Sequence, residues 1–286
     1  MKKTLLFIAT LLTSYLGMAQ ETYHPTAENL KAREQFQDDK FGIFLHWGLY
    51  SMMGTTEWIM TNRDINYKEY PKLAKTFYPS EFDADAWVKA IKAAGAKYIT
   101  ITTRHHDGFS LFKTSTSTYN SVDGTPFKRD IIKEMADACQ RNGIKLHLYY
   151  SHLDWGREDY PVGRTGTGTG RPKEKANWAS YYKFMNTQLT ELLTNYGKVG
   201  AIWFDGWWDH DSDAKPFDWQ LEEQYAMIHK LQPQCLIANN HHHTPFPGED
   251  IQIFERDLPG ENKAGLSGQS IGRLPLESCQ TINEHW

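Results

Sequence analysis

The sequence predicts an α/β fold, a (β/α)8 TIM-like barrel, and three features of its pattern carry that prediction. Amphipathic helical stretches alternate with short β-rich runs, several helical stretches stop at a glycine just before the next run, and polar residues gather where each run ends. Alternation of this kind implies parallel strands joined by helical crossovers, and in such a barrel the loops after the strands build the site. An open doubly wound sheet is the alternative, but no G-x-G-x-x-G follows a strand and no P-loop is present.

Four helices are expected between the strands. Apolar residues recur with helical spacing behind the capping residues Asp83 and Asp130, while Gly95 and Gly143 follow the last turns of these two helices. The expected ranges of the four helices are about 84–94, 131–142, 178–195 and 218–231.

Six strands are expected, ending at about residues 46, 103, 150, 205, 239 and 254. A closed barrel of this type has eight strands, so we expect the barrel to be incomplete at the C-terminus. The stretch 163–171 is rich in glycine, threonine and arginine. It is expected to be a loop long enough to overhang the site.

Residues 1–19 have the three parts of a secretory signal peptide: a start with two lysines, the apolar run Thr4 to Leu16, and small residues before the cleavage expected after Ala19. The apolar run is too short to span a bilayer, so a secreted protein without membrane insertion is expected. Removing the two lysines changes the formal charge from −4 to −6. This acidic balance argues against nucleic acid as a partner.

The three cysteines, Cys139, Cys235 and Cys279, are odd in number and widely spaced. They make neither a disulfide framework nor a C-x-x-C metal pair, so buried free thiols are expected. An exported chain without obligatory disulfides suits the periplasm or cell surface of a Gram-negative bacterium better than a eukaryotic disulfide scaffold.

The run from Gly200 to Trp208 places Asp205 at the end of an apolar strand, among three tryptophans that include Trp203 and Trp207. A carboxylate at the end of a buried strand loses solvation, so donors, a partner charge or a ligand must stabilise it. The flat apolar faces of tryptophan match the C–H faces of a sugar ring. Asp205 is therefore interpreted as a catalytic group that acts on a carbohydrate, with a helix cap or a loop anchor as the structural alternative.

Glycoside hydrolysis needs a second carboxyl group, which is kept protonated to assist departure of the leaving oxygen. The candidates are Glu255 at the end of the sixth expected strand, Glu277 and Glu57. Glu255 is favoured because it closes a strand two places round the barrel and can face Asp205 across the mouth. A salt bridge with the adjoining Arg256 is the alternative role for Glu255.

Three histidines near strand ends, His46, His105 and His106, raise the hypothesis of a metal-dependent hydrolase. No H-E-x-x-H and no matching carboxylate spacing accompany them. Neutral imidazoles that hydrogen-bond sugar hydroxyls are therefore favoured, and no metal or other cofactor is expected. The loop residues His241 to His243 are expected to be merely polar, and Asp209 to Asp213 to form a solvated acidic loop.

Several segments near the expected strand ends are specific when taken as a set. They are Phe41-Gly-Ile-Phe-Leu-His-Trp-Gly48, Glu57-Trp58, Arg104-His-His-Asp-Gly-Phe109, Lys128-Arg-Asp130, Tyr149-Tyr-Ser151, Asp154-Trp155 and Trp203-Phe-Asp-Gly206. Together, from about Phe36 to the last residue, they resemble the family 29 glycoside hydrolases, which are retaining exo-α-L-fucosidases.

This resemblance implies hydrolysis of terminal α-L-fucosyl residues from glycoconjugates by double displacement, with a fucosylated glycan as substrate and Asp205 as nucleophile. Relatives often carry Thr-Pro-Glu where this chain has Ile-Phe-Glu255. Glu255 is thus the provisional acid/base, and Glu277 stays open. The resemblance also implies a set of residues that hold the fucose or lie near it: His46, His105, His106, Tyr149, Trp203, Glu57 and Trp58.

Members of this family usually continue into the last barrel strands and a C-terminal β-sandwich. Residues 20–286 are therefore expected to be the catalytic barrel domain without these parts. An inactive or glycan-binding fragment of such an enzyme is the alternative, beside the metal-dependent barrel hydrolase. The sequence indicates neither the oligomeric state nor the linkage and aglycone preference.

Overall fold

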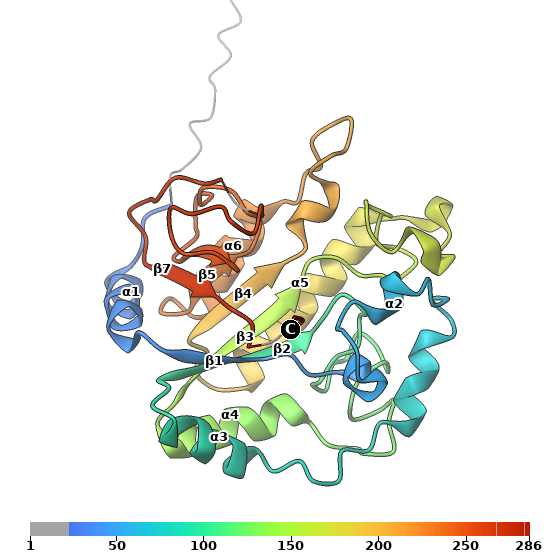
Figure 1. Cartoon of the computed structure of the whole chain (residues 1–286), viewed down its shortest axis with the longest axis horizontal. Coiled ribbons are helices and arrows are strands. Elements are labelled where there is room, and N and C mark those ends of the chain that lie inside the picture. The colour runs from blue at the N-terminus through green and yellow to red at the C-terminus, as the bar shows by residue number, and fades with distance from the viewer. Residues whose placement is uncertain (1–22, 267, 283) are drawn as a thin grey trace, which may run out of the picture.

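Parallel strands form the centre of the computed structural model, which describes residues 23–266, 268–282 and 284–286 (Figure 1). Five strands lie side by side in chain order, and two more pair with each other. An isolated parallel bridge between Ala238 and Ile251 links the two sets. The strands are β1 (Gly42–Leu45), β2 (Tyr98–Arg104), β3 (Lys145–Ser151), β4 (Ala201–Asp205), β5 (Leu236–Asn239), β6 (Gln252–Glu255) and β7 (Leu276–Cys279).

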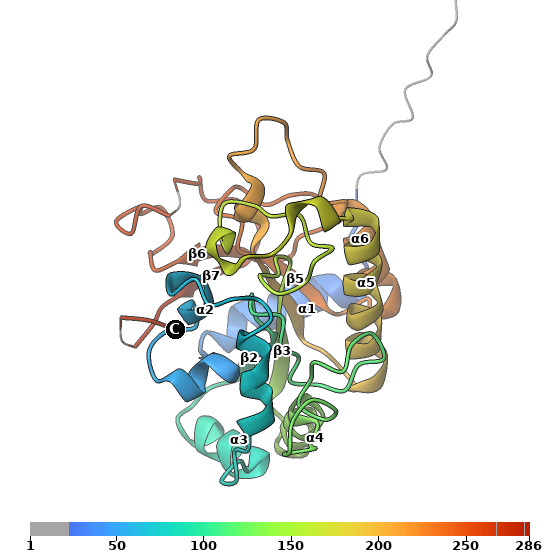
Figure 2. The ribbon, with the colours of Figure 1, turned by 90° about the vertical axis from the view of Figure 1, so that its right-hand side faces the viewer.

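Helices connect the first five strands and cover their outer side, and Figure 2 shows the last two of them side by side along one flank. The α-helices are α1 (Ala27–Asp39), α2 (Ile59–Asn62), α3 (Ala84–Ala93), α4 (Ile131–Asn142), α5 (Trp178–Asn195) and α6 (Leu221–Leu231). Short 3₁₀ helices are η1 (Leu49–Met53), η2 (Tyr70–Thr76), η3 (Thr167–Thr169), η4 (Lys173–Lys175) and η5 (Trp207–His210).

The predicted helix ends are formed by the expected residues. The Asp83 carboxylate accepts a hydrogen bond from the backbone N–H of Ala86 at the start of α3. Asp130 does the same for Lys133 at the start of α4, whose C-cap Gly143 takes the left-handed conformation with φ of 65°. Each cap satisfies backbone groups that the helix itself leaves unpaired, which fixes where each crossover helix begins or ends.

The structure confirms an α/β fold with parallel strands consistent with an incomplete barrel, and it corrects the strand count. The described residues contain a seventh strand, β7, where none was expected. The predicted strands β1 and β5 are equally short, but they contain runs of apolar residues, whereas β7 includes Glu277 and Ser278 and therefore shows no apolar run. The fourth predicted helix begins at Leu221 rather than at 218. The connection 240–251 between β5 and β6 contains no helix.

A buried ion pair ties the ends of β2 and β3 together. Arg104 and Asp154 are both fully buried, and the guanidinium also receives support from the Tyr181 hydroxyl and from the backbone carbonyl of Ser151. A side chain at Gly108 would run into the Asp154 carboxylate, and Gly108 has a φ of 77°, so glycine is required there. The pair therefore fixes the two loops that follow β2 and β3.

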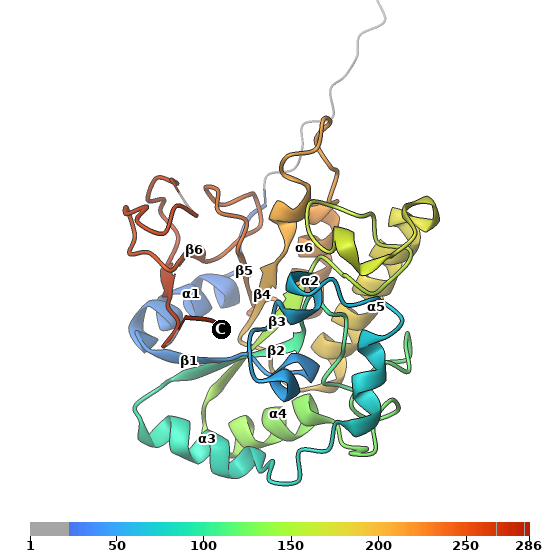
Figure 3. The same ribbon diagram turned by 45° about the vertical axis from the view of Figure 1, so that its right-hand side comes forward.

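The C-terminal residues run back toward the carboxyl ends of the strands, as two views show (Figures 1 and 3). The ring of Trp286 lies against that of His46, with centroids 5.5 Å apart. Within the described part of the chain, no helix is both long and apolar enough to cross a membrane.

Candidate active site

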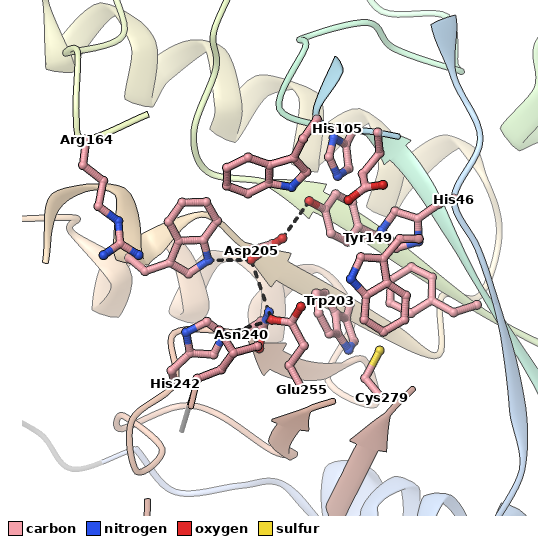
Figure 4. A pocket seen from close by; sticks show the side chains of 16 residues that line it. His46, His105, Tyr149, Arg164, Trp203, Asp205, Asn240, His242, Glu255 and Cys279 are labelled. Atoms are coloured by element: carbon pink, nitrogen blue, oxygen red, sulfur yellow. Dashed lines mark hydrogen bonds and ion pairs between the residues drawn. The ribbon is translucent and has the colours of Figure 1, made fainter. Parts of the chain in front are cut away.

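A small pocket opens at the carboxyl ends of the strands (Figure 4). Its volume is about 160 Å³, which is small beside the 300–1,000 Å³ usual for drug-sized ligands and suits a single sugar ring. The residues that line it come from all seven strands or their following loops, as expected for a barrel. They are Phe44, His46, Glu57, Trp58, His105, Tyr149, Arg164, Trp203, Asp205, Trp208, Asn240, His242, Glu255, Leu266, Cys279 and Trp286.

Asp205, the last residue of β4, stands at the centre of this pocket with four groups around its carboxylate. The Tyr149 hydroxyl donates to Oδ2 at 3.0 Å, and the Trp208 indole N–H donates to Oδ1 at 3.0 Å. The backbone N–H of Gly206 donates to Oδ1 at 2.8 Å, and His106 Nε2 lies 3.4 Å from Oδ2. The carboxylate is thus held in one orientation by groups from β3 and from the segments that follow β2 and β4.

These donors decide the charge state of Asp205. Burial by itself would raise the pKa of this carboxyl group, but the hydrogen bond and charge of His106 and the hydrogen bond from Trp208 outweigh it. The pKa of Asp205 therefore lies below its ordinary value. The group is an anion at neutral pH, which is the state that a nucleophile requires.

Asn240, just after β5, bridges Asp205 to a second carboxylate. Its amide nitrogen lies 3.4 Å from Asp205 Oδ1 and 2.7 Å from Glu255 Oε2. The two oxygens therefore lie no more than about 6 Å apart, the sum of the two contacts. Carboxyl groups are about 5 to 5.5 Å apart in retaining glycosidases and about 6.5 to 9.5 Å apart in inverting ones.

Glu255, at the end of β6, is paired with His242 and not with Arg256. His242 Nε2 lies 2.9 Å from Glu255 Oε2, so the expectation that this loop histidine is merely polar was wrong. Two non-glycine residues near this carboxylate have left-handed backbones: His242 with φ of 66° and Arg256 with φ of 58°. Such conformations are strained, and they persist only where the surrounding structure holds them.

Two of the three strand-end histidines, His46 and His105, line the pocket, whereas His106 does not. Burial is the largest influence on His46 and His105, lowering the pKa of His46 to about 3 and that of His105 well below its usual range. Both imidazoles are therefore neutral at physiological pH and can exchange hydrogen bonds with hydroxyl groups. His106 is buried beside Asp205, and its Nδ1 lies 2.7 Å from Ser151 Oγ.

Aromatic rings make the walls of the pocket. The indole of Trp203 stacks on the Tyr149 ring, with centroids 5.5 Å apart, and Trp58 stacks on Trp208 at the same distance. Trp207, the other tryptophan beside Asp205 in sequence, does not line the pocket and packs instead against loop residues such as Phe246. Of the three tryptophans near Asp205, Trp203 and Trp208 therefore line the pocket, and Trp207 packs against a loop.

Two further candidate carboxyl groups occupy different positions. Glu57 lines the pocket, and burial raises its pKa. Glu277 does not line the pocket. It pairs in register with Ile253, two residues before Glu255, and so lies farther from the carboxyl end of the strands, where the pocket opens. Burial raises the pKa of Glu277 to about 7. It is Cys279, beside Glu255 in register, that reaches the pocket from β7.

Asp209 was expected in a solvated loop, and the structure shows that it is fully buried. Its carboxylate accepts hydrogen bonds from the Tyr160 hydroxyl and from the backbone and hydroxyl of Thr165. A side chain at Gly163 would clash with Asp209, so only glycine allows this approach. Asp209 therefore anchors the glycine-rich loop 163–171 and places Arg164 at the pocket. No local pattern marks Arg164 as a pocket residue.

The described residues contain no group of three or more His, Cys, Asp or Glu side chains arranged to hold a metal ion. The three cysteines are buried free thiols, as predicted.

A carboxylate pair of this separation, in a tryptophan-lined pocket at the carboxyl ends of parallel strands, is the arrangement of glycoside hydrolases built on α/β barrels. The particular family follows from comparison with known proteins. Residues 10–286 match the family model described as Alpha-L-fucosidase, so the chain belongs to the alpha-L-fucosidase family.

Relatives and solved structures agree with this assignment. The chain is 31% identical to a putative alpha-L-fucosidase of Caenorhabditis elegans over 95% of its own length and 57% of the relative's, and 31% identical to the plasma alpha-L-fucosidase of Rattus norvegicus over 80% and 52%. Alpha-L-fucosidase isoenzyme 1 from Paenibacillus thiaminolyticus superposes with a TM-score of 0.75 at 37% identity, covering 89% of this chain and 62% of that one.

A second solved structure carries a ligand. Alpha-L-fucosidase AlfC from Lactobacillus casei, in complex with alpha-L-fucose product, is 30% identical, with a TM-score of 0.68, and covers 78% of this chain and 74% of that one. The chain spans little more than half the length of the two curated relatives from Caenorhabditis elegans and Rattus norvegicus.

Proposed function

We propose that this protein is a retaining α-L-fucosidase that removes terminal α-L-fucosyl residues from glycoconjugates. The observation that carries the proposal is the Asn240 bridge, which holds the Asp205 and Glu255 oxygens within about 6 Å of each other over a pocket the size of one sugar. Membership of the alpha-L-fucosidase family supports fucose as that sugar.

Asp205 acts as the nucleophile in the first step. Its oxygen attacks the anomeric carbon of the fucosyl group and forms a covalent fucosyl-enzyme, while the bond to the leaving oxygen breaks. Glu255 delivers a proton to that oxygen as it departs. The donors around Asp205 keep it ionised and aimed before the sugar arrives, so little reorganisation accompanies the attack.

Glu255 acts as base in the second step. It removes a proton from a water molecule, the water oxygen attacks the same anomeric carbon, and Asp205 leaves as a carboxylate. Fucose is released with its anomeric configuration retained. Glu255 supports this double role better than Glu277, because Glu255 lines the pocket beside Asn240 and Glu277 does not.

The inner end of the pocket binds the fucose. Neutral imidazoles of His46 and His105 supply hydrogen bonds to its hydroxyl groups, and the flat ring of Trp203 packs against its apolar face. Tyr149 lines the pocket and also contacts Asp205, so it serves both the sugar and the nucleophile. His106 was predicted to hold the sugar, but it does not line the pocket, and its role is to orient Asp205. Glu57 and Trp58 complete the rim on the side of α2.

Hydrolysis of an aryl α-L-fucoside by the purified chain tests this proposal. Asp205→Ala is expected to lower kcat by several orders of magnitude, and azide is expected to restore turnover, because a small anion can replace a lost nucleophile. Asp38→Ala, on the exposed part of α1, is the matched control. A fluorinated fucosyl substrate should label Asp205 itself; labelling of any other residue would overturn the assignment.

Two alternatives give different results. A metal-dependent hydrolase would lose activity in EDTA, whereas the carboxylate mechanism does not depend on metal. A glycan-binding protein without catalysis would retain fucose in a binding experiment and leave the aryl fucoside intact. Comparing the 286-residue chain with a version extended to complete the barrel separates an inactive fragment from a wrong substrate.

We also propose that the protein is exported to the periplasm or cell surface of a Gram-negative bacterium. The support is the signal-peptide pattern of residues 1–19, which lies outside the described residues. Fractionation of expressing cells, with N-terminal sequencing of the exported form, tests this. A cytoplasmic protein that begins at Met1 would refute it.

A further inference from the structure

The pocket has a closed inner end and an open mouth, and one charged side chain stands at the mouth. Tyr149 and His105, at the inner end, are 0% and 3% exposed. Asp205 and Glu255, in the middle, have side chains 13% and 16% exposed, whereas the side chain of Arg164 is 47% exposed. Figure 4 shows Arg164 on the side of Asp205 opposite His46.

Arg164 is held in this position by its neighbours. Its backbone N–H donates to the Asp209 carbonyl at 2.9 Å, beside the Thr165 contacts that anchor the glycine-rich loop. Its guanidinium lies over the Trp208 ring at 5.2 Å and pairs with Asp211 at 3.2 Å. The pair with Asp211 uses one nitrogen of a guanidinium that has five N–H donors, so other donors stay available on a side chain that lines the pocket and is held in place in advance.

Arg164 lies where the leaving group of the substrate would pass through the mouth of the pocket. A terminal fucosyl residue fills the inner end, so the rest of the glycan extends from the carboxylate pair through the mouth. We propose that Arg164 binds the first sugar of the leaving group. This inference rests on the proposed function and adds the class of leaving group to it.

The surroundings of Trp208 determine which groups the mouth of the pocket offers to a ligand. Here the indole of Trp208 is stacked by Trp58 and lies under the Arg164 guanidinium. The mouth therefore offers N–H donors, which match the hydroxyl and amide oxygens of a sugar such as N-acetylglucosamine.

The experiment compares two substrates that differ only in the leaving group. α-L-Fucosyl fluoride has no aglycone, so its kcat/KM reports the fucose site and the carboxylates alone. Fucosyl-N-acetylglucosamine disaccharides of each available linkage fill the mouth, and the one that the wild type hydrolyses best is used. The variants are Arg164→Ala and Arg164→Lys, with Arg141→Ala on the exposed side of α4 as the control.

Arg164→Ala is expected to lower kcat/KM for the disaccharide about tenfold more than for the fluoride, which corresponds to one charge-assisted hydrogen bond. Arg164→Lys is expected to recover part of that loss, and Arg141→Ala should leave the ratio of the two substrates as in the wild type. An equal loss with both substrates would overturn the inference, since Arg164 would then act through the carboxylates. No loss with either substrate would overturn it too.

Failure of the inference can be told apart from failure of the proposed function. A wild-type chain that hydrolyses the fluoride but none of the disaccharides retains the fucosidase activity and refutes the role of Arg164. A wild-type chain that hydrolyses neither refutes the fucosidase proposal itself. Thermal melting of each variant confirms that it is folded before its rates are compared.

Discussion

Glu277→Gln is expected to abolish a loss of stability that the wild type undergoes as the pH rises from 4.5 to about 7. Glu277 points into the barrel from β7, is 8% exposed, and has one side-chain oxygen without a hydrogen-bond partner. Burial raises its pKa from an ordinary 4.5 to about 7, because the ionised form loses solvation without a compensating charge. Glutamine has the shape of the protonated form and cannot ionise.

The sign and size of the effect follow from linkage. The folded state binds this proton more tightly than the unfolded state, so the stabilisation is complete below pH 4.5 and is lost as the pH rises through about 7. The pKa of Glu277 rises from 4.5 to about 7 on folding. At 1.36 kcal/mol per pKa unit, this rise corresponds to about 3 kcal/mol in the free energy of unfolding. The Gln variant should therefore gain about 3 kcal/mol in free energy of unfolding relative to wild type between about pH 4 and pH 8, almost all of it below about pH 7.

Urea denaturation followed by tryptophan fluorescence, at one-unit steps across this range, measures the difference directly. Glu34→Gln, on the exposed face of α1, is the matched control and should show the wild-type dependence on pH. The other titrating groups are the same in the variant and the wild type, so their contributions cancel in the difference between the two free energies of unfolding. A Gln variant whose curve runs parallel to wild type would refute the reasoning, because Glu277 would then be equally protonated in the folded and unfolded states.

Three other predictions can be checked with standard assays. Asn240→Ala should lower kcat for the aryl fucoside about 100-fold, since the amide no longer sets the spacing of Asp205 and Glu255; a loss below twofold would remove the bridge from the mechanism. Asp154→Asn should lower the free energy of unfolding by about 3 to 5 kcal/mol in urea, because it leaves the buried Arg104 without its partner charge; a change under about 1 kcal/mol would contradict this. The buried thiols of Cys139 and Cys235, which do not line the active-site pocket, should react with Ellman's reagent only after unfolding, and fast labelling of either in the native protein would contradict this.

Much of the fold could be predicted because its signals are local. Helix caps at Asp83 and Asp130, apolar faces with helical spacing, and glycines before strands act within a few residues, and the structure reproduces them. β7 was missed because its four residues include Glu277 and Ser278 and form no apolar run, so the strand is defined only by its pairing with β6, twenty or more residues away. Such pairing leaves almost no trace in the local sequence.

The same distinction applies to the site. Asp205 could be recognised, since an acid at the end of an apolar strand is unusual in itself. The contacts of His242 and Asp209 could not, because each depends on a loop returning from elsewhere in the chain. Histidine and aspartate in polar loops are common, and only the fold shows that one reaches Glu255 and the other is buried under the glycine-rich loop.

The left-handed backbone of Arg256 has a consequence for engineering. Its side chain is exposed, and its backbone N–H, which donates to the Cys279 carbonyl, would remain in a glycine variant. Arg256→Gly would relieve the strain of a non-glycine residue at φ of 58°, but it would also let the chain beside Glu255 sample more conformations. Selection for heat resistance alone would thus favour substitutions here that slow the reaction, and a thermostable variant of this protein should be sought away from this turn.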